Sequence, residues 1–549
     1  MKAELIQQAR SSSPSSSDDE SEEAFEEAPM QCGVISKQHV WPLLALAAWL
    51  IYLVAAMLIR PDRSWPLAAF TAICITGVML SRSGLLTALS NRMSMLQSPA
   101  VERTIFGLLI LALLIIVVRL LAEGGPDSAY RLQSLLGTVV LSALCALVSW
   151  NFRGIPWRVV ISGFLLQFFL GFFVMKVPAG MKFFKDSGDA VTAFLHYVEY
   201  GELMVFGEHI KPFSMAFNVL PTIIFFSAFV ACMYYLGVLQ VAVHIVAFTM
   251  KKLVGTSMVQ SVNAAANLFL GQSEAPLLIK SFLPTASPCD LHCVMVGGFA
   301  SVSGSILACY IGMGVSASQL IGASVMSVPG TLFVSNLVCP PGSLREEEVQ
   351  QTSEGTPSDD DFEFPPATET NIVQAAGNGA VAAVELVLNI GALLIAFISL
   401  KAATDGLLHS LGTNVGVPEL SFELISSYIF WPLAWLLGTP AQDCAHVARL
   451  IGTKIAVNEF VAYENLGKLL GNEEGQGEII QRQLSERAEL IATYALCGFS
   501  NFGSVGVQLA VFSTLCPGRK TVFAKLVMSA MLAGNVVCFM TATCAGILN

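Results

Sequence analysis

The chain has 549 residues, of which 54% are hydrophobic and only 13% are charged, and its mean hydropathy is +0.66. Soluble globular proteins carry about 25% charged residues, so this composition excludes an ordinary soluble enzyme and favours a membrane protein. The net charge of −11 arises in two stretches, 1–40 with eight acids and three bases, and 340–371 with nine acids and one base. The remaining chain is close to neutral and holds no Lys/Arg cluster that would bind a nucleic acid.

The first half of the chain predicts a series of membrane spans. Residues 1–40 form an acidic, serine-rich tail, which we expect to be disordered because it has little apolar surface to bury. Hydrophobic segments near the length of a bilayer crossing follow at 41–59, 65–80, 104–122, 132–150 and 159–175. The loops that would share the side of the tail hold six Lys/Arg against three in the others, which predicts a cytoplasmic N-terminus.

The pattern changes after the fifth span. Residues 183–198 alternate apolar and charged side chains at helical spacing, which predicts a helix lying in the membrane interface, and 219–235 reads as a further span. From 250 onwards Gly, Pro, Asn, Gln, Ser and Glu interrupt the apolar segments. Broken segments survive at membrane depth only where protein or a water-filled cavity surrounds them, and in transporters they mark the substrate site.

Two acidic motifs lie between apolar flanks. The first runs from Asn263 to Pro276 and contains Asn267, Gln272, Ser273 and Glu274, and Gly271 with Pro276 fits the tip of a re-entrant hairpin. The second runs from 457 to 463 and contains Glu459. An ionisable residue at membrane depth is costly and is by default functional. The alternatives are a loop outside the bilayer for the first motif, and a surface helix for the second, which has Lys454 and Glu464 close by.

A third feature links the two motifs. Residues 298–305 (GFASVSGS) are similar to 498–504 (GFSNFGS), 200 residues later, and each copy follows one acidic motif. Chance similarity between short Gly/Ser-rich segments is the alternative. The matching order of elements favours an internal repeat of hairpin and broken helix, which builds many secondary transporters.

The polar residues of these motifs define the expected chemistry. Glu274 and Glu459 accept hydrogen bonds, and amides and hydroxyls surround them at Gln272, Asn501, Ser305 and Ser504. No Arg or Lys lies in the motifs, so a neutral, hydrogen-bonding solute is favoured over a carboxylate or phosphate. Phe299 and Phe499 either stack on a flat ring or pack in the core. Asn267 and Ser301, with carbonyls freed by the helix breaks, would suit a small hard cation.

The motifs resemble those of the concentrative nucleoside transporters. Residues 271–278 (GQSEAPLL) are similar to the family's first hairpin, 458–464 (NEFVAYE) to its second, and 492–504 (ATYALCGFSNFGS) to its second broken helix. The similarity extends over about 41–549. It implies an all-α polytopic membrane protein with about eleven transmembrane helices and two re-entrant hairpins in an internal repeat. It also implies an elevator-type homotrimer that imports nucleosides with sodium, with no cofactor besides this coupling ion.

The resemblance also implies a division of the chain. Three accessory helices lie in 41–122, scaffold helices with the interfacial helix in 123–250, and the first repeat in 251–339. An acidic variable linker without transport chemistry spans 340–371. The second repeat covers 372–549, with a broken helix at 490–512 and a last helix at 524–548.

The resemblance assigns roles to particular residues. Gln272, Ser273 and Glu274 match hairpin contacts of the family, the first and last to the nucleobase. Glu459, Asn501 and Ser504 match its ribose contacts, and Phe499 lies in the same stretch. Asn267 and Ser301 match side-chain sodium ligands, and Leu270 and Val302 match backbone-carbonyl ligands. Gly271 and Gln272, together with Ser305 and Ile306, resemble the members that accept both purine and pyrimidine nucleosides.

Rival classes remain open. A proton-coupled member of the family would depart from the sodium pattern at Asn267 and Ser301. An elevator-type carboxylate transporter would carry Arg at its site. An intramembrane hydrolase needs motifs that this sequence lacks, so no enzyme is expected. The family resemblance favours a plasma-membrane protein surrounded by lipid.

Overall fold

The computed structural model describes residues 37–59, 71, 99–123, 126–207, 220–343, 364–365, 369–470 and 483–549. The chain divides into two compact units, Met1–Thr76 and Gly77–Asn549. The first unit is described mainly through helix α1 (Lys37–Ile59), where the Trp49 indole donates a hydrogen bond to Thr71 Oγ1 at 3.2 Å. Residues 1–36 of the predicted tail therefore lie outside the described residues. The predicted span 65–80 is described only at Thr71.

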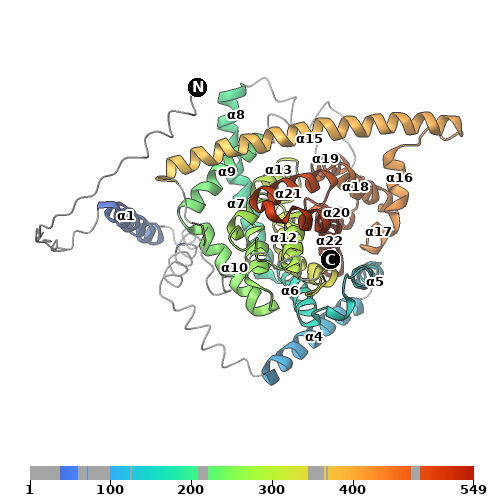
Figure 1. The fold of residues 1–549 in the computed structure, drawn as a ribbon, viewed down its shortest axis with the longest axis horizontal. Helices are drawn as coiled ribbons and strands as arrows, with labels where there is room; N and C mark the ends of the chain where they lie inside the picture. The colour runs from blue at the N-terminus through green and yellow to red at the C-terminus, as the bar shows by residue number, and fades with distance from the viewer. Residues whose placement is uncertain are drawn as a thin grey trace, which may run out of the picture. The chain divides into compact units, whose positions relative to one another are not determined.

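Every regular element in the described ranges is helical (Figure 1). Among the described residues of the second unit, seven α-helices precede the first acidic motif: α4 (Pro99–Ala122), α5 (Pro126–Leu147), α6 (Trp157–Lys176), α7 (Pro178–Leu195), α8 (Val198–Phe206), α9 (Leu220–Tyr235) and α10 (Val238–Val254). Helix α7 covers most of the predicted interfacial segment but begins at Pro178, because a proline at the first position needs no N–H partner. It packs against α6 and α14.

The remaining chain repeats one order of elements: a hairpin, a broken helix and a long helix. The first series is α11 (Met258–Ala266) with the 3-10 turn η5 (Ala275–Ile279), then α12 (Pro288–Ala300), α13 (Gly304–Gly312) and α14 (Ala317–Val338). The second is α18 (Cys444–Ala456), α19 (Glu459–Leu470), α20 (Glu486–Leu496), α21 (Phe502–Leu515), η7 (Pro517–Arg519) and α22 (Lys520–Leu548). Helices α15 (Ile372–Asn414), α16 (Phe422–Ile429) and α17 (Trp431–Leu436) connect the two series.

The protein is an all-helical, multi-span membrane protein. Six described helices are long and apolar enough to cross a membrane, and a seventh span results if α9 and α10, which meet at 79°, form one bent crossing. The sequence indicated a span at 219–235 but not the second limb of this bend. In the spans 288–312 and 317–338, 89% of the apolar window is buried, against 17% in α15, so the broken helix and α14 are interior and α15 is peripheral.

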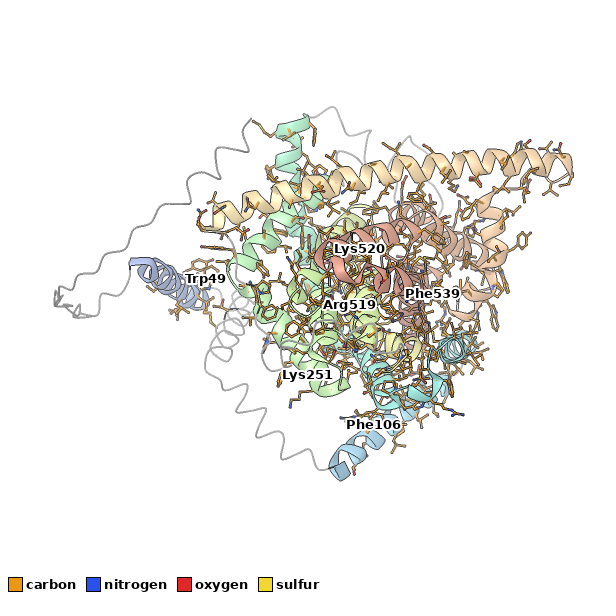
Figure 2. All side chains as sticks on the ribbon, viewed as in Figure 1. Trp49, Phe106, Lys251, Arg519, Lys520 and Phe539 are labelled. Carbon is orange, nitrogen blue, oxygen red and sulfur yellow. The ribbon has the colours of Figure 1, made fainter. Side chains whose placement is uncertain are left out.

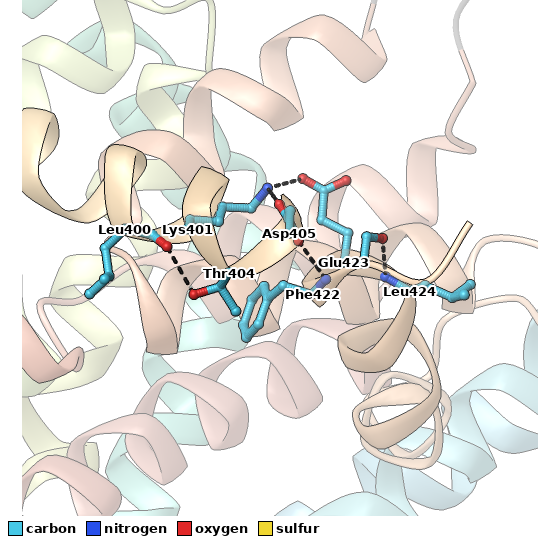
Figure 3. A network of polar contacts seen from close by, with 8 residues as sticks. Leu400, Lys401, Thr404, Asp405, Phe422, Glu423 and Leu424 are labelled. Atoms are coloured by element: carbon cyan, nitrogen blue, oxygen red, sulfur yellow. Dashed lines mark hydrogen bonds and ion pairs between the residues drawn. The ribbon is translucent and has the colours of Figure 1, made fainter. Parts of the chain in front are cut away.

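Helix α15 runs past the other helices and projects beyond α16 (Figure 1). Its 43 residues make it about 65 Å long, twice the roughly 30 Å of a bilayer core. Its far end is polar, and there Lys401 pairs with Asp405 and with Glu423 of α16, each at 3.0 Å (Figure 3). Asp405 Oδ1 also accepts the Phe422 N–H at 2.7 Å. These contacts fasten α16 to α15 beyond the apolar part of the helix.

A buried arginine holds the end of the first hairpin. Arg519, labelled in Figure 2, lies at the start of α22 and donates from Nη1 to the carbonyls of Leu283 at 3.0 Å and Ala286 at 2.6 Å. Bonds from a charged donor are stronger than those between neutral groups. The segment leaving the hairpin is thus anchored to the last helix of the chain.

Candidate functional site

The two broken helices touch at their breaks. Ser303 is the N-cap of α13 and Asn501 is the N-cap of α21, so each second half-helix begins at a polar side chain that caps it. Across the breaks, Ser500 Oγ donates to Phe299 O at 2.9 Å. The two similar segments are therefore neighbours in space although they lie 200 residues apart.

The similarity that suggested a repeat holds in the order of elements but not residue by residue. Gly298 lies inside α12, whereas Gly498 lies in the break after α20 at a φ of +154°. A side chain at Gly498 would place its Cβ 2.7 Å from Cys538 Sγ and 2.9 Å from Phe299 O. Only glycine fits this backbone and this close approach. Phe299 has no exposed surface and Phe499 is nearly buried, so for Phe299 the packing alternative is correct.

The first hairpin carries oxygen atoms without partners. Asn267 caps the end of α11 and donates from Nδ2 to Asn263 O at 2.9 Å. The Oδ1 atoms of Asn263 and Asn267 are buried and have no hydrogen-bond partner among the described residues. Gly297 of α12 faces both amides, and Ser301 Oγ donates to the Gly297 carbonyl at 2.7 Å. Buried polar atoms are normally satisfied, so a buried oxygen without a partner in the chain is a candidate contact for an ion, a ligand or a water molecule.

The four predicted sodium ligands come from two adjoining segments. Asn267 and Leu270 lie in the hairpin turn, and Ser301 and Val302 lie in the break of the first helix. The Gly304 N–H donates to Phe269 O at 3.3 Å and joins the two segments. Ligands of this kind are amide, hydroxyl and carbonyl oxygens, which suit a hard cation.

A chain of hydrogen bonds connects the two hairpins. Glu459, the first residue of α19, is 3% exposed and accepts a hydrogen bond from Asn501 Nδ2 at 2.6 Å. Asn501 Oδ1 accepts the Ser504 N–H at 2.8 Å, and Ser504 Oγ accepts from Gln272 Nε2 at 3.4 Å. The contact thus runs Gln272–Ser504–Asn501–Glu459. Gln272 Oε1 is buried with no donor among the described residues, which leaves one acceptor for a ligand.

Glu274 faces a cavity. Its side chain is exposed, and its Oε2 accepts the Gly271 N–H at 3.2 Å. The cavity measures about 1100 Å³ and is lined by Glu274, Leu270 and Ser305 together with residues of α9 and α15. Lys280 and Glu369 also line it, so it is not a purely acidic space. Ligand pockets generally measure about 300–1000 Å³, so the cavity is large enough for a small organic solute.

The end of the acidic linker forms part of the cavity wall. Phe364, Pro365 and Glu369 line the cavity. Two tyrosines of α9 hold this segment, because the Tyr234 hydroxyl donates to Pro365 O at 2.8 Å and the Tyr235 hydroxyl donates to Thr370 O at 3.2 Å. The last residues of the linker thus contribute to the cavity wall, and the absence of transport chemistry in the linker stays a prediction.

The other predicted residues lie near these groups. Ser305 is buried and its hydroxyl pairs with that of Ser303 at 3.1 Å, while Ile306 is buried beside it and Ser273 is half-buried in the hairpin turn. The structure therefore brings Gln272, Ser504, Asn501 and Glu459 into one chain of contacts. It places Glu274 and Ser305 on the cavity, with no direct contact between the two glutamates.

The burial of Lys454 bears on the alternative of a surface helix for the second acidic motif. The alternative rested on the nearby charges of Lys454 and Glu464, but the Lys454 side chain has no exposed surface. Its Nζ donates to Ala495 O at 2.9 Å and lies 5.9 Å from the ring centre of Phe539 on α22. The signal available in the sequence was a single lysine three residues before the second acidic motif.

Comparisons with known proteins cover most of the chain. Residues 319–546 match the family described as Na+ dependent nucleoside transporter C-terminus, 136–209 match its N-terminus, and 216–317 match a family described as Nucleoside recognition. The last of these ranges contains the first hairpin and the first broken helix.

Individual relatives and solved structures agree. Solute carrier family 28 member 3 of Mus musculus is 36% identical over 530 residues, which cover 94% of this chain and 73% of that protein. Sodium/nucleoside cotransporter 1 of Mus musculus is 40% identical over 430 residues, covering 77% of this chain and 65% of that protein. The structure of CNTnw in an inward-facing substrate-bound state is 35% identical with a TM-score of 0.68, covering 76% of this chain and 98% of that chain.

Proposed function

This chain belongs to the sodium-dependent nucleoside transporter family, and from that premise we propose that it imports purine and pyrimidine nucleosides by symport with sodium. The proposal includes an elevator-type protein of about eleven spans and two re-entrant hairpins. It also includes a homotrimer in the plasma membrane with a cytoplasmic N-terminus.

The observation that carries the proposal is the position of the orphaned oxygens. The unpartnered Oδ1 atoms of Asn263 and Asn267 lie at the start of the hairpin turn that also contains Gln272 and Glu274. A sodium ion at Asn267 and Ser301, with the carbonyls of Leu270 and Val302, would satisfy the Asn267 Oδ1 atom and order the turn. Substrate affinity would then depend on the ion, and by linkage the affinity for the ion would depend on the substrate.

The substrate side is supported by the distribution of acceptors and donors. In the proposed binding mode the base contacts Gln272 and Glu274, and the sugar hydroxyls contact Glu459, Asn501 and Ser504. Gln272 Oε1 has no donor within the described part of the chain, and it would accept a base N–H. A carboxylate orients sugar hydroxyls by accepting their hydrogen bonds. Ser273, Ser305, Ile306 and Phe499 complete the proposed lining, and Ser305 with Ile306 would set the acceptance of both base classes.

Uptake of radiolabelled uridine and inosine tests this function in cells that lack their own nucleoside transporters. Uptake is measured in sodium buffer and in choline buffer at two pH values. We expect uptake of both nucleosides in sodium and its loss in choline. Uptake that persists in choline and rises at acid pH would replace sodium by protons as the coupling ion. No uptake of either nucleoside, with the protein shown at the cell surface, would reject nucleoside transport and return attention to carboxylates.

A further inference from the structure

The tip of the second hairpin and the break of the second broken helix each bring together one helix C-terminus and one helix N-terminus. Helix α18 ends at Ala456 and α19 begins at Glu459, and α20 ends at Leu496 where α21 begins at Phe502. The last carbonyls of a helix carry a partial negative charge, and the first N–H groups carry a partial positive charge. Four helix ends therefore meet in a small buried volume.

Two buried charges lie at these four ends with complementary signs. Lys454 is in the last turn of α18 and donates to Ala495 O in the last turn of α20, so the cation lies at two negative ends. Glu459 is in the first turn of α19 and accepts from Asn501, the N-cap of α21, so the anion lies at two positive ends. The side chains of Lys454 and Glu459 thus supply charges opposite in sign to the partial charges of these four helix ends.

The second arm of the hairpin holds the same helix end. The Tyr463 hydroxyl donates to Thr493 O at 2.8 Å, and its ring lies 4.3 Å from that of Tyr310 on α13. Both helices of the hairpin therefore donate a hydrogen bond to the C-terminal end of α20. The donor is charged in Lys454 and neutral in Tyr463. A variant at Tyr463 therefore shows the effect of losing a hydrogen bond to α20 without losing a charge.

The first hairpin lacks such a cation. At the corresponding place it presents Asn263 and Asn267, whose Oδ1 atoms have no partner among the described residues. In the proposed function the first hairpin takes its cation from solution, while the second carries a cation on the chain. This difference indicates that Lys454 serves the substrate side of the site and not the coupling ion.

We propose that Lys454 is a positioning residue, which favours the charged form of the Glu459 carboxylate, helps to fix it against Asn501 and so sets the affinity for the hydroxyl-bearing sugar of the substrate. The inference rests on the proposed function. A buried anion persists only when it is paired or compensated by charge, and Lys454, five residues before Glu459, is a fully buried cation at the adjoining helix ends.

Uptake kinetics of the full-length protein test the role. Lys454→Met, Lys454→Arg and Tyr463→Phe are compared at matched surface expression by the KM and maximal rate of uridine uptake in saturating sodium. We expect Lys454→Met to raise the KM at least about tenfold, the ratio that corresponds to one lost charge interaction of moderate strength. Lys454→Arg should retain most of the affinity. Tyr463→Phe removes a hydrogen bond to α20 but no charge, and it should raise the KM less than Lys454→Met does. A parental KM in Lys454→Met, or equal KM changes in Lys454→Met and Tyr463→Phe, would overturn the proposal.

A second measurement does not depend on transport. Thermal unfolding of the purified protein is followed for Lys454→Met, Glu459→Gln and the double variant. Either single change leaves one buried charge without its counterpart, so the double variant is expected to melt above the temperature that the summed single effects predict. The same cycle with Glu464→Gln, an exposed position on α19, is expected to be additive.

The outcomes of the two measurements are distinct. Additive effects of Lys454→Met and Glu459→Gln would overturn the coupling between them even if nucleoside transport is demonstrated. If the parental chain transports no nucleoside, the proposed function fails, and the thermal cycle still decides whether the two charges are coupled. If Lys454→Met alone does not reach the membrane, recovery of protein in the double variant supports the coupling, and no recovery rejects it.

Discussion

Replacement of Glu459 by glutamine removes one negative charge from the centre of the hydrogen-bond chain. The Asn501 Nδ2 atom lies 2.6 Å from Glu459 Oε2, and the carboxylate is only 3% exposed. A glutamine has one acceptor oxygen in place of two, and it presents an NH₂ group where the carboxylate accepts hydrogen bonds. Asn501 cannot simply turn over to suit it, because its Oδ1 already accepts the Ser504 N–H.

The magnitude follows from the kind of bond that is lost. Hydrogen bonds to charged groups contribute about 1.5–3 kcal/mol, roughly twice the contribution of neutral ones. If the same carboxylate accepts a bond from a sugar hydroxyl, Glu459→Gln should weaken substrate binding by about 10- to 100-fold, since 1.4 kcal/mol corresponds to a factor of ten. We expect this as an increase in the KM for uridine at saturating sodium.

The matched control is the same substitution five residues later on the same helix. Glu464 pairs with Lys468 at 2.7 Å, but its side chain is 37% exposed and that of Lys468 is 45% exposed. Exposed pairs contribute about 0–1 kcal/mol, so Glu464→Gln should leave the KM within about threefold of the parental value. Uridine uptake is measured for both variants after quantifying protein at the cell surface. A Glu459→Gln variant with the KM of the Glu464→Gln control would refute a role of this carboxylate in binding.

Three further changes test other parts of the structure. Glu274→Gln should abolish most uptake with little change in thermal stability, because the carboxylate faces the cavity and not the core; equal uptake at matched surface expression would contradict its assigned role. Gly297→Ala places a Cβ 2.8 Å from Asn267 Nδ2 and should raise the sodium concentration for half-maximal uptake by about tenfold, whereas Gly312→Ala, with open space around its Cβ, should not. An unchanged sodium dependence in Gly297→Ala would separate Asn267 from ion binding. Lys401→Met removes two partly exposed ion pairs and should lower the melting temperature by about 1–2 °C without altering the KM, and a changed KM would give the α15–α16 contact a role in transport.

Local composition was sufficient to find the hairpins and the breaks. Polar residues inside apolar segments, such as Asn267 and Asn501, have few structural alternatives to capping a helix or lining a site, because bilayer lipid offers them no partners. Asn267 caps α11 and Asn501 caps α21. The order of elements in the two series followed from the same signals. The residue-by-residue match of the two copies could not be predicted in this way. Gly298 lies in a helix and Gly498 lies in a break, and the position of the break depends on the side chains and backbone that pack against each glycine.

Features that depend on distant partners were beyond reach of the sequence. The wall formed by Phe364 and Pro365 depends on hydroxyls of α9, which lie more than 100 residues away along the chain. The sequence also did not predict the bend between α9 and α10. Two short apolar helices have the same composition whether they meet at 79° or lie in separate segments. Composition measures the neighbours in sequence, whereas both of these features are set by neighbours in space.

The burial of Lys454 shows why a charge near an acidic motif does not by itself indicate a surface. A buried ammonium is costly unless its donors are used and its charge is compensated. Compensation here comes from the C-terminus of α20, where Ala495 lies 41 residues after Lys454. The break that ends α20 is therefore the same feature that exposes carbonyls for Lys454 and creates the N-cap Asn501 for Glu459. A continuous helix would offer neither end. Breaking one helix thus creates places for a cation and an anion together, and the hairpin that crosses the break supplies both charges.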